Sequence, residues 1–262
     1  LHVPVVFRAL KDRWFVALKP AGFASPASPP FPSVEATLRP FVGGRALSFP
    51  VRPDREGQGL VVVTTDDAMH KSFDELVRRR LVQTSFRVLA DVSGLSPSEV
   101  GDLRSHICTP SGQAEGLSKV RRCELQSGPI ACPQFGSLQT AIFLVQASTS
   151  AASQVRTRFA EAGCPLLFDQ RHHPRYIKQV QSGIPGSFHG VSDFWGGGTE
   201  EDEKMPLVGA LGMQLCLLEM PDPFRYSQRL RISAPLPKEW DAIHPALEAD
   251  PGYGEDCEDL LG

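Results

Sequence analysis

The stretch FPVRPDREGQGLVVVTTDDAMHK, residues 49–71, contains the features that decide the fold. Its first half places Asp54 between Arg52 and Arg55, and its second half is an apolar, β-branched run that follows two glycines. A run of this length and composition predicts a buried strand at residues 59–64. A carboxylate between two guanidiniums at the start of a buried strand has two interpretations. It is an ionised functional group, or it is part of an ion-paired surface turn of a common kind.

The segment that follows, residues 66–80 (DDAMHKSFDELVRRR), predicts an amphipathic helix. It begins with acids and ends with bases, which suits the helix dipole. Its apolar side chains fall on one face, and they are Met69, Phe73, Leu76 and Val77.

Other segments predict strands that are interspersed with helices but follow no regular alternation. The expected strands are residues 14–18, 86–92, 138–146, 209–220 and 229–234. A short helix is expected to begin at Ser33, and further helices at residues 154–162 and 235–243. This order predicts an α+β fold around a mixed, largely antiparallel sheet. We expect one domain at residues 1–245 and an acidic tail at residues 246–262.

The composition is that of a globular protein with a sizeable core, since 41% of the 262 residues are apolar and 22% are charged. No window approaches the roughly 18 to 20 apolar residues that a membrane span needs, so we expect no membrane association. None of the six cysteines forms a C-x-x-C pair, which argues against a zinc site. Adjacent His172 and His173 would point to opposite sides of an extended segment, so we expect no metal.

The net charge of −3 argues against nucleic-acid binding, but the charge is unevenly distributed. Six acids and no base lie within residues 248–259, so the remainder of the chain carries +3. Basic clusters occur at residues 78–80, 121–122 and 171–178. An arginine run is usually a solvated helix face, so these clusters permit RNA binding without demonstrating it.

Five segments in order match one family pattern across nearly the whole chain. They are ALKPAG (17–22), VRPDREGQGL (51–60), RRRLVQTSFRVLADVSG (78–94), QVRTRFAEAGCPLLFDQR (154–171) and LRISAPLPKEW (230–240). Together they resemble the RluA-type family of RNA pseudouridine synthases. The resemblance implies RNA as the partner and no metal or other cofactor.

The resemblance also implies a set of site residues. Asp54 occupies the place of the family's catalytic aspartate, and Arg156 that of the arginine that pairs with it. Phe86 stands where the family normally has a tyrosine that stacks on the target base. A guanidinium lowers the pKa of a neighbouring carboxyl group by about 1 to 3 units. Arg156, together with Arg52, is therefore expected to keep Asp54 ionised.

Given an RNA-binding fold, several basic side chains are expected to contact RNA. They are Lys19, Arg55, Arg78, Arg79, Arg80 and Arg158.

The chain departs from the family pattern at several places, and these departures keep two hypotheses open. Val51 replaces the usual histidine, Pro53 the leucine, and residues 150–153 read Ser-Ala-Ala-Ser in place of Gly-Arg-Thr-His. The first hypothesis is a synthase that acts on a uridine in structured RNA, and we expect this RNA to be ribosomal. The alternative is a synthase-like RNA-binding factor in ribosome large-subunit assembly whose catalysis is weak or lost. We expect a mitochondrial location, or failing that another intracellular compartment.

Overall fold

The computed structural model of the chain describes residues 3–9, 13–108, 120–132, 137–174, 211–241 and 243–244. The strands are β1 Val5–Arg8, β2 Trp14–Lys19, β3 Ser48–Val51, β4 Gln58–Thr64, β5 Gln83–Asp91, β6 Val120–Ala131, β7 Gln139–Ala147, β8 Met213–Pro221 and β9 Arg229–Ser233. The α-helices are α1 Val34–Leu38, α2 Asp67–Arg78, α3 Pro97–Cys108 and α4 Ala152–Glu161. Short 3-10 helices cover Arg39–Val42, Thr149–Ala151 and Lys238–Trp240.

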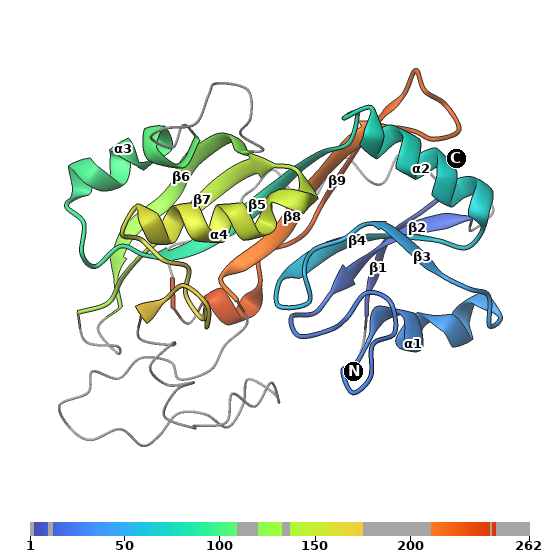
Figure 1. The fold of residues 1–262 in the computed structure, drawn as a ribbon, viewed down its shortest axis with the longest axis horizontal. Helices are drawn as coiled ribbons and strands as arrows, with labels where there is room; N and C mark the ends of the chain where they lie inside the picture. The colour runs from blue at the N-terminus through green and yellow to red at the C-terminus, as the bar shows by residue number, and fades with distance from the viewer. Residues whose placement is uncertain are drawn as a thin grey trace.

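The described strands form one sheet with two halves, which lie side by side in Figure 1. One half contains β1 to β4, and the other contains β5 to β9. The strand order is β1-β2-β4-β8-β5-β7-β6, with β3 also paired to β4 and β9 to β8. All of these pairings are antiparallel except that between β4 and β8, which is parallel. The prediction of an α+β fold around a mixed, largely antiparallel sheet is confirmed.

The two halves are joined where β4 pairs with β8, and this short pairing includes a glycine. Gln58 pairs with Gln214, and Gly59 pairs with Leu215. Gly59 has φ +110°, and a Cβ atom there would lie 2.2 Å from the carbonyl oxygen of Leu215. Only glycine allows this conformation and this close approach. The loop between β3 and β4, residues 52–57, is consequently placed where the two halves meet.

Both faces of the sheet are covered, one by α2, α3 and α4, and the other by α1 and the C-terminal 3-10 turn. Helices α2, α3 and α4 share one buried cluster with Phe86 of β5. On the opposite face, α1 packs through Val34 against β2 and β4, and Trp240 packs with Leu89 of β5. Successive side chains of a strand point to opposite faces. Phe86 therefore lies on the face that α4 covers.

Most predicted elements are found within a few residues of their expected bounds, but one predicted helix is wrong. Among the described residues 235–241 and 243, the regular structure is the short 3-10 turn Lys238–Trp240. Pro235 and Pro237 explain the difference, because proline lacks an N–H donor and disfavours helical geometry in the residue before it. The sequence also gave no indication of β1, β3, β6 or α3.

Several expectations concern features that the described residues test only in part. Within the described ranges, no helix is long and apolar enough to cross a membrane. Among the same residues, no three His, Cys, Asp or Glu side chains gather as a metal site. Five described cysteines are free thiols. The predicted tail at residues 246–262, the acids at residues 200–203 and Cys257 lie outside the described residues.

Candidate active site

A shallow hollow where the two halves meet brings Asp54 and Phe86 together. It is narrow, with essentially no space that would hold a water molecule, and its lining is mostly apolar. The lining residues are Pro53, Asp54, Gly57, Phe86, Ala152, Leu211, Met213 and Leu215. Asp54 is exposed at the rim, whereas Phe86 is fully buried in β5. The hollow therefore offers one carboxylate to a ligand, whereas the ring of Phe86, expected to stack on the target base, has no exposed face in this structure.

The Asp54 carboxylate has no hydrogen bond or ion pair with any other described residue. The pairing with Arg52 that the sequence suggested is not formed, because Arg52 Nη1 donates to the carbonyl oxygen of Phe49 at 3.0 Å. The interpretation of this turn as a simple surface ion pair is therefore wrong. The carboxylate is free to meet a ligand.

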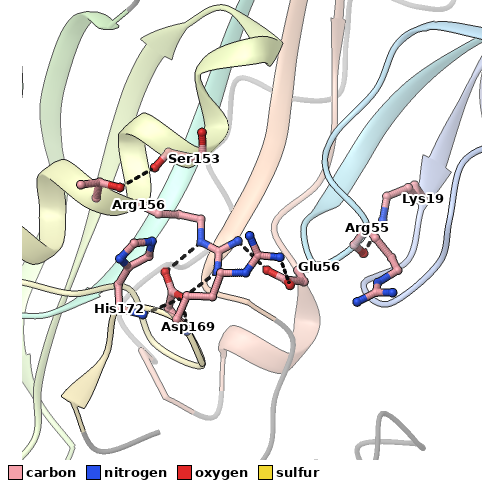
Figure 2. Close-up of polar contacts among 9 residues, drawn as sticks. Lys19, Arg55, Glu56, Ser153, Arg156, Asp169 and His172 are labelled. Atoms are coloured by element: carbon pink, nitrogen blue, oxygen red, sulfur yellow. Dashed lines mark hydrogen bonds and ion pairs between the residues drawn. The ribbon is translucent and has the colours of Figure 1, made fainter. Parts of the chain in front are cut away.

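Arg156 also has partners other than the expected Asp54. Its side chain projects from α4 and is only 2% exposed. Nε and Nη2 donate to Asp169 Oδ2 and Oδ1 at 2.9 and 2.6 Å, and Nη1 donates to Glu56 Oε2. Figure 2 shows the guanidinium between the two carboxylates. The expected Arg156–Asp54 pair is thus corrected to contacts with Asp169 and Glu56.

These contacts belong to a network that crosses from one half of the sheet to the other. Glu56 also accepts a hydrogen bond from Arg171 Nη2 at 2.8 Å. Burial would raise the pKa of Asp169, but hydrogen bonds and charge from Arg156 hold that pKa below its usual value. Asp169 is therefore ionised, and the network fixes the loop two residues from Asp54.

Lys19 fixes the same loop from the other side. It ends β2, is 1% exposed, and donates from Nζ to the carbonyl oxygens of Pro20, Arg55 and Gly57 at 3.1, 3.0 and 2.5 Å. Burial lowers the pKa of Lys19 to about 7, while the charge of Asp54 acts in the opposite direction. The expected contact between Lys19 and RNA is therefore corrected to a structural role in the loop (Figure 2).

The other predicted RNA-binding residues divide into one buried and several exposed side chains. Arg158 is buried and donates from Nη1 to the carbonyl oxygen of Ile107 at 2.8 Å, which removes it from the surface. Arg78, the last residue of α2, and Arg79, which caps it, are exposed and form ion pairs with Glu75. The remaining two, Arg80 and Arg55, are exposed.

Sequence reasoning missed Glu56, Asp169 and Phe31 as parts of the site. Arg156 lies 13 residues from Asp169 and 100 residues from Glu56 along the chain. The guanidinium carbon of Arg55 lies 4.0 Å from the centre of the Phe31 ring. No local pattern shows such pairings, because neither helical nor strand periodicity relates residues this far apart.

Comparison with known proteins identifies the fold. No family model matches the sequence, and no curated protein sequence matches it at a significant level. Among solved structures, the chain is similar to Human RNA Pseudouridylate Synthase Domain Containing 1. The TM-score is 0.57, at 13% sequence identity over 89% of this chain and 83% of the other. It is also similar to Human RNA Pseudouridylate Synthase Domain Containing 4, with a TM-score of 0.53 at 16% identity over 90% of each chain. The chain has a pseudouridine synthase-type fold.

Proposed function

We propose that this chain is an RNA pseudouridine synthase of the RluA type and that Asp54 is its catalytic residue. The observation that carries the proposal is the position of Asp54. Its unpartnered, exposed carboxylate stands at the rim of a hollow that Phe86 also lines. The fold is that of proteins named as RNA pseudouridylate synthase domains, and this supports the same assignment.

The proposed reaction needs only what the site contains. The bond between ribose C1′ and uracil N1 breaks, C1′ rejoins the ring at C5, the proton on C5 is lost, and N1 gains a proton. No electrons enter or leave, so one carboxylate acting as nucleophile or base suffices. For a uracil extruded from the RNA to reach the carboxylate and stack on Phe86, the hollow would have to widen and uncover the ring, which is fully buried in this structure. Lys19 and the Glu56–Arg156 contact hold the loop in place for this step.

Replacing Asp54 by asparagine tests the proposal with little change in side-chain shape. In cells that carry only Asp54→Asn, we expect pseudouridine to disappear from the target site of this protein. Chemical or mass-spectrometric mapping of pseudouridine in ribosomal RNA, mitochondrial RNA included, is the measurement. Asp102→Asn, at an exposed acid on α3, is the matched control and should leave the modification intact. Unchanged modification at every site with Asp54→Asn would exclude the catalytic role.

A second function is favoured by the contacts of Arg156. Because its three donating nitrogens are engaged by Asp169 and Glu56, Asp54 lacks the guanidinium that its family role implies. The chain would then bind RNA during ribosome large-subunit assembly with weak catalysis or none. In that case Asp54→Asn leaves assembly intact, whereas charge reversal at Arg78, Arg79 and Arg80 impairs it. Sequencing RNA crosslinked to the protein would identify the substrate in both cases.

A further inference from the structure

The residue that follows Asp54 in the chain, Arg55, is an exposed arginine that lies over the ring of Phe31. The guanidinium carbon of Arg55 sits 4.0 Å from the centre of the Phe31 ring. The Phe31 side chain remains 38% exposed, and Arg55 is exposed as well. Arg55 follows Asp54 in the chain, so the backbone that carries the stack is one residue from the rim of the hollow.

The guanidinium of Arg55 has unused hydrogen-bond donors. Within the described part of the chain, its side chain takes part in no hydrogen bond and no ion pair. The comparison with Arg13 and Phe224 is informative, since Arg13 also lies over a ring, at 5.7 Å. Two N–H groups of Arg13, on Nε and Nη2, donate to Asp66 at 2.9 Å each. Of these two arginines, Arg13 is held by an ion pair with Asp66, whereas Arg55 keeps all of its side-chain N–H groups free of hydrogen bonds to the described residues.

The backbone on both sides of the stack is held in place. The carbonyl oxygen of Arg55 accepts hydrogen bonds from Lys19 Nζ and from the N–H of Gly22, each at 3.0 Å. The Phe31 N–H donates to the carbonyl oxygen of Ser28 at 3.0 Å. A stack with fixed backbone loses little conformational freedom when a ligand binds, which favours recognition.

We propose that Phe31 and Arg55 form a stacking platform for a nucleobase that flanks the target uridine in a single-stranded stretch of RNA. This inference rests on the proposed function and deepens it, because it assigns a subsite for the substrate next to the reacting base. The hollow would receive the extruded uracil, and the neighbouring base would lie on the platform.

The chemistry of the platform fits a nucleotide in particular. The guanidinium carbon lies 4.0 Å from the centre of the Phe31 ring, and because Arg55 is exposed, a base could approach from its solvent side. Arginine planes and aromatic rings are the surfaces on which proteins stack the bases of single-stranded RNA. The free N–H groups at the edge of the same guanidinium suit a phosphate oxygen. Such stacking tolerates any base, so the platform would position RNA without selecting its sequence.

A fluorescent oligonucleotide tests the platform directly. The probe is a decamer of uridylate that carries one 2-aminopurine, a base whose fluorescence falls when it stacks. With the wild-type protein we expect binding and quenching. Phe31→Ala and Arg55→Ala should each weaken binding about tenfold, in the range measured for one stacked base, and abolish the quenching. Arg55→Lys keeps the positive charge but removes the planar guanidinium group on which a base would stack, so the quenching should also be absent.

Phe224→Ala is the matched control, because it removes an exposed ring below an arginine that Asp66 already holds through two hydrogen bonds. It should bind and quench like the wild type, and circular dichroism verifies that each variant is folded. The platform is refuted if Phe31→Ala and Arg55→Lys bind and quench normally, or if the wild type does not bind the probe. Asp54→Asn separates the two proposals. If it binds and quenches normally while retaining pseudouridine formation, the catalytic assignment fails and the platform stands.

Discussion

At the scale of single residues, the contact with the largest energetic consequence is that between Arg156 and Asp169. Both side chains are buried, and two hydrogen bonds join them. Removing one partner of a buried ion pair leaves an uncompensated charge, which costs far more than the pair contributes. The sequence alone showed neither the burial nor the partner.

We predict that Arg156→Met lowers the free energy of unfolding by about 3 to 5 kcal/mol, because the Asp169 carboxylate is then buried without its guanidinium. Urea denaturation measures the change. The double variant Arg156→Met with Asp169→Leu should recover a large part of the loss, since neither charge remains. A double variant as unstable as the single one would contradict this account.

Glu56→Gln is the matched control for the same network. Glu56 is 21% exposed and Arg156 keeps both hydrogen bonds to Asp169 in this variant. We therefore expect a loss of less than about 1 kcal/mol.

How well the site could be predicted differs from residue to residue. Asp54 and Phe86 were named from the resemblance, and the structure places both at one hollow. Their chemical roles stay predictions. The partners of Arg156 and the burial of Lys19 could not be predicted, because they depend on how distant segments meet. From sequence alone a basic residue is expected to be exposed, because lysine and arginine are rarely buried.

At the scale of elements, the decisive feature is the short parallel pairing of β4 with β8. A Cβ atom added at Gly59 would lie 2.2 Å from the carbonyl oxygen of Leu215. The loop that carries Asp54 enters β4 immediately before this contact. The position of the candidate catalytic residue thus depends on one glycine.

We predict that Gly59→Ala destabilises the protein by more than about 2 kcal/mol, because its φ of +110° and the contact with Leu215 both oppose a side chain. Thermal and urea unfolding are suitable measurements. Gly57→Ala is the matched control. A Cβ atom at Gly57 would meet its nearest neighbour at an ordinary 3.6 Å, so little change is expected. Equal stability of the two variants would show that the junction tolerates a side chain.

The elements that sequence reasoning predicted well are those with strong local signals. Helix α2 has an amphipathic pattern and begins after Asp66, whose side chain accepts a hydrogen bond from the N–H of Met69. Helix α3 was missed, because Gly101 interrupts its pattern. Strand β6 was missed because it is an edge strand with many exposed polar residues and contains Gly128 and Pro129.

At the scale of the whole molecule, the described C-terminal segment closes the face of the sheet opposite α4. Trp240 and Ile243 pack with Leu89 of the sheet. His244 is fully buried, and its Nδ1 and Nε2 lie 2.9 Å from the hydroxyl oxygens of Thr140 and Ser127. A neutral imidazole can satisfy both hydroxyl groups, because it offers one donor and one acceptor.

We predict that the protein loses stability as the pH falls from 6.5 towards 4. Burial lowers the pKa of His244 from 6.5 to about 4. Across this interval the unfolded chain binds a proton that the folded chain does not, so stability rises with pH. The contribution is up to about 3 kcal/mol, and urea denaturation at pH 7, 5.5 and 4.5 measures it. His244→Gln should show a smaller dependence on pH, and a dependence as steep as that of the wild type would exclude His244 as its source.

The junction between β4 and β8 also bears on how the protein is made. Its two strands are separated by about 150 residues, and a ribosome adds roughly 5 to 20 residues per second. Strand β3 is made earlier and covers part of the β4 edge that β8 joins, so only the end of β4 at Gln58 and Gly59 waits for β8, on the order of 10 seconds or longer. An uncovered edge can pair with other chains. A chaperone that shields this strand end would therefore act while the N-terminal half has been made and β8 has not.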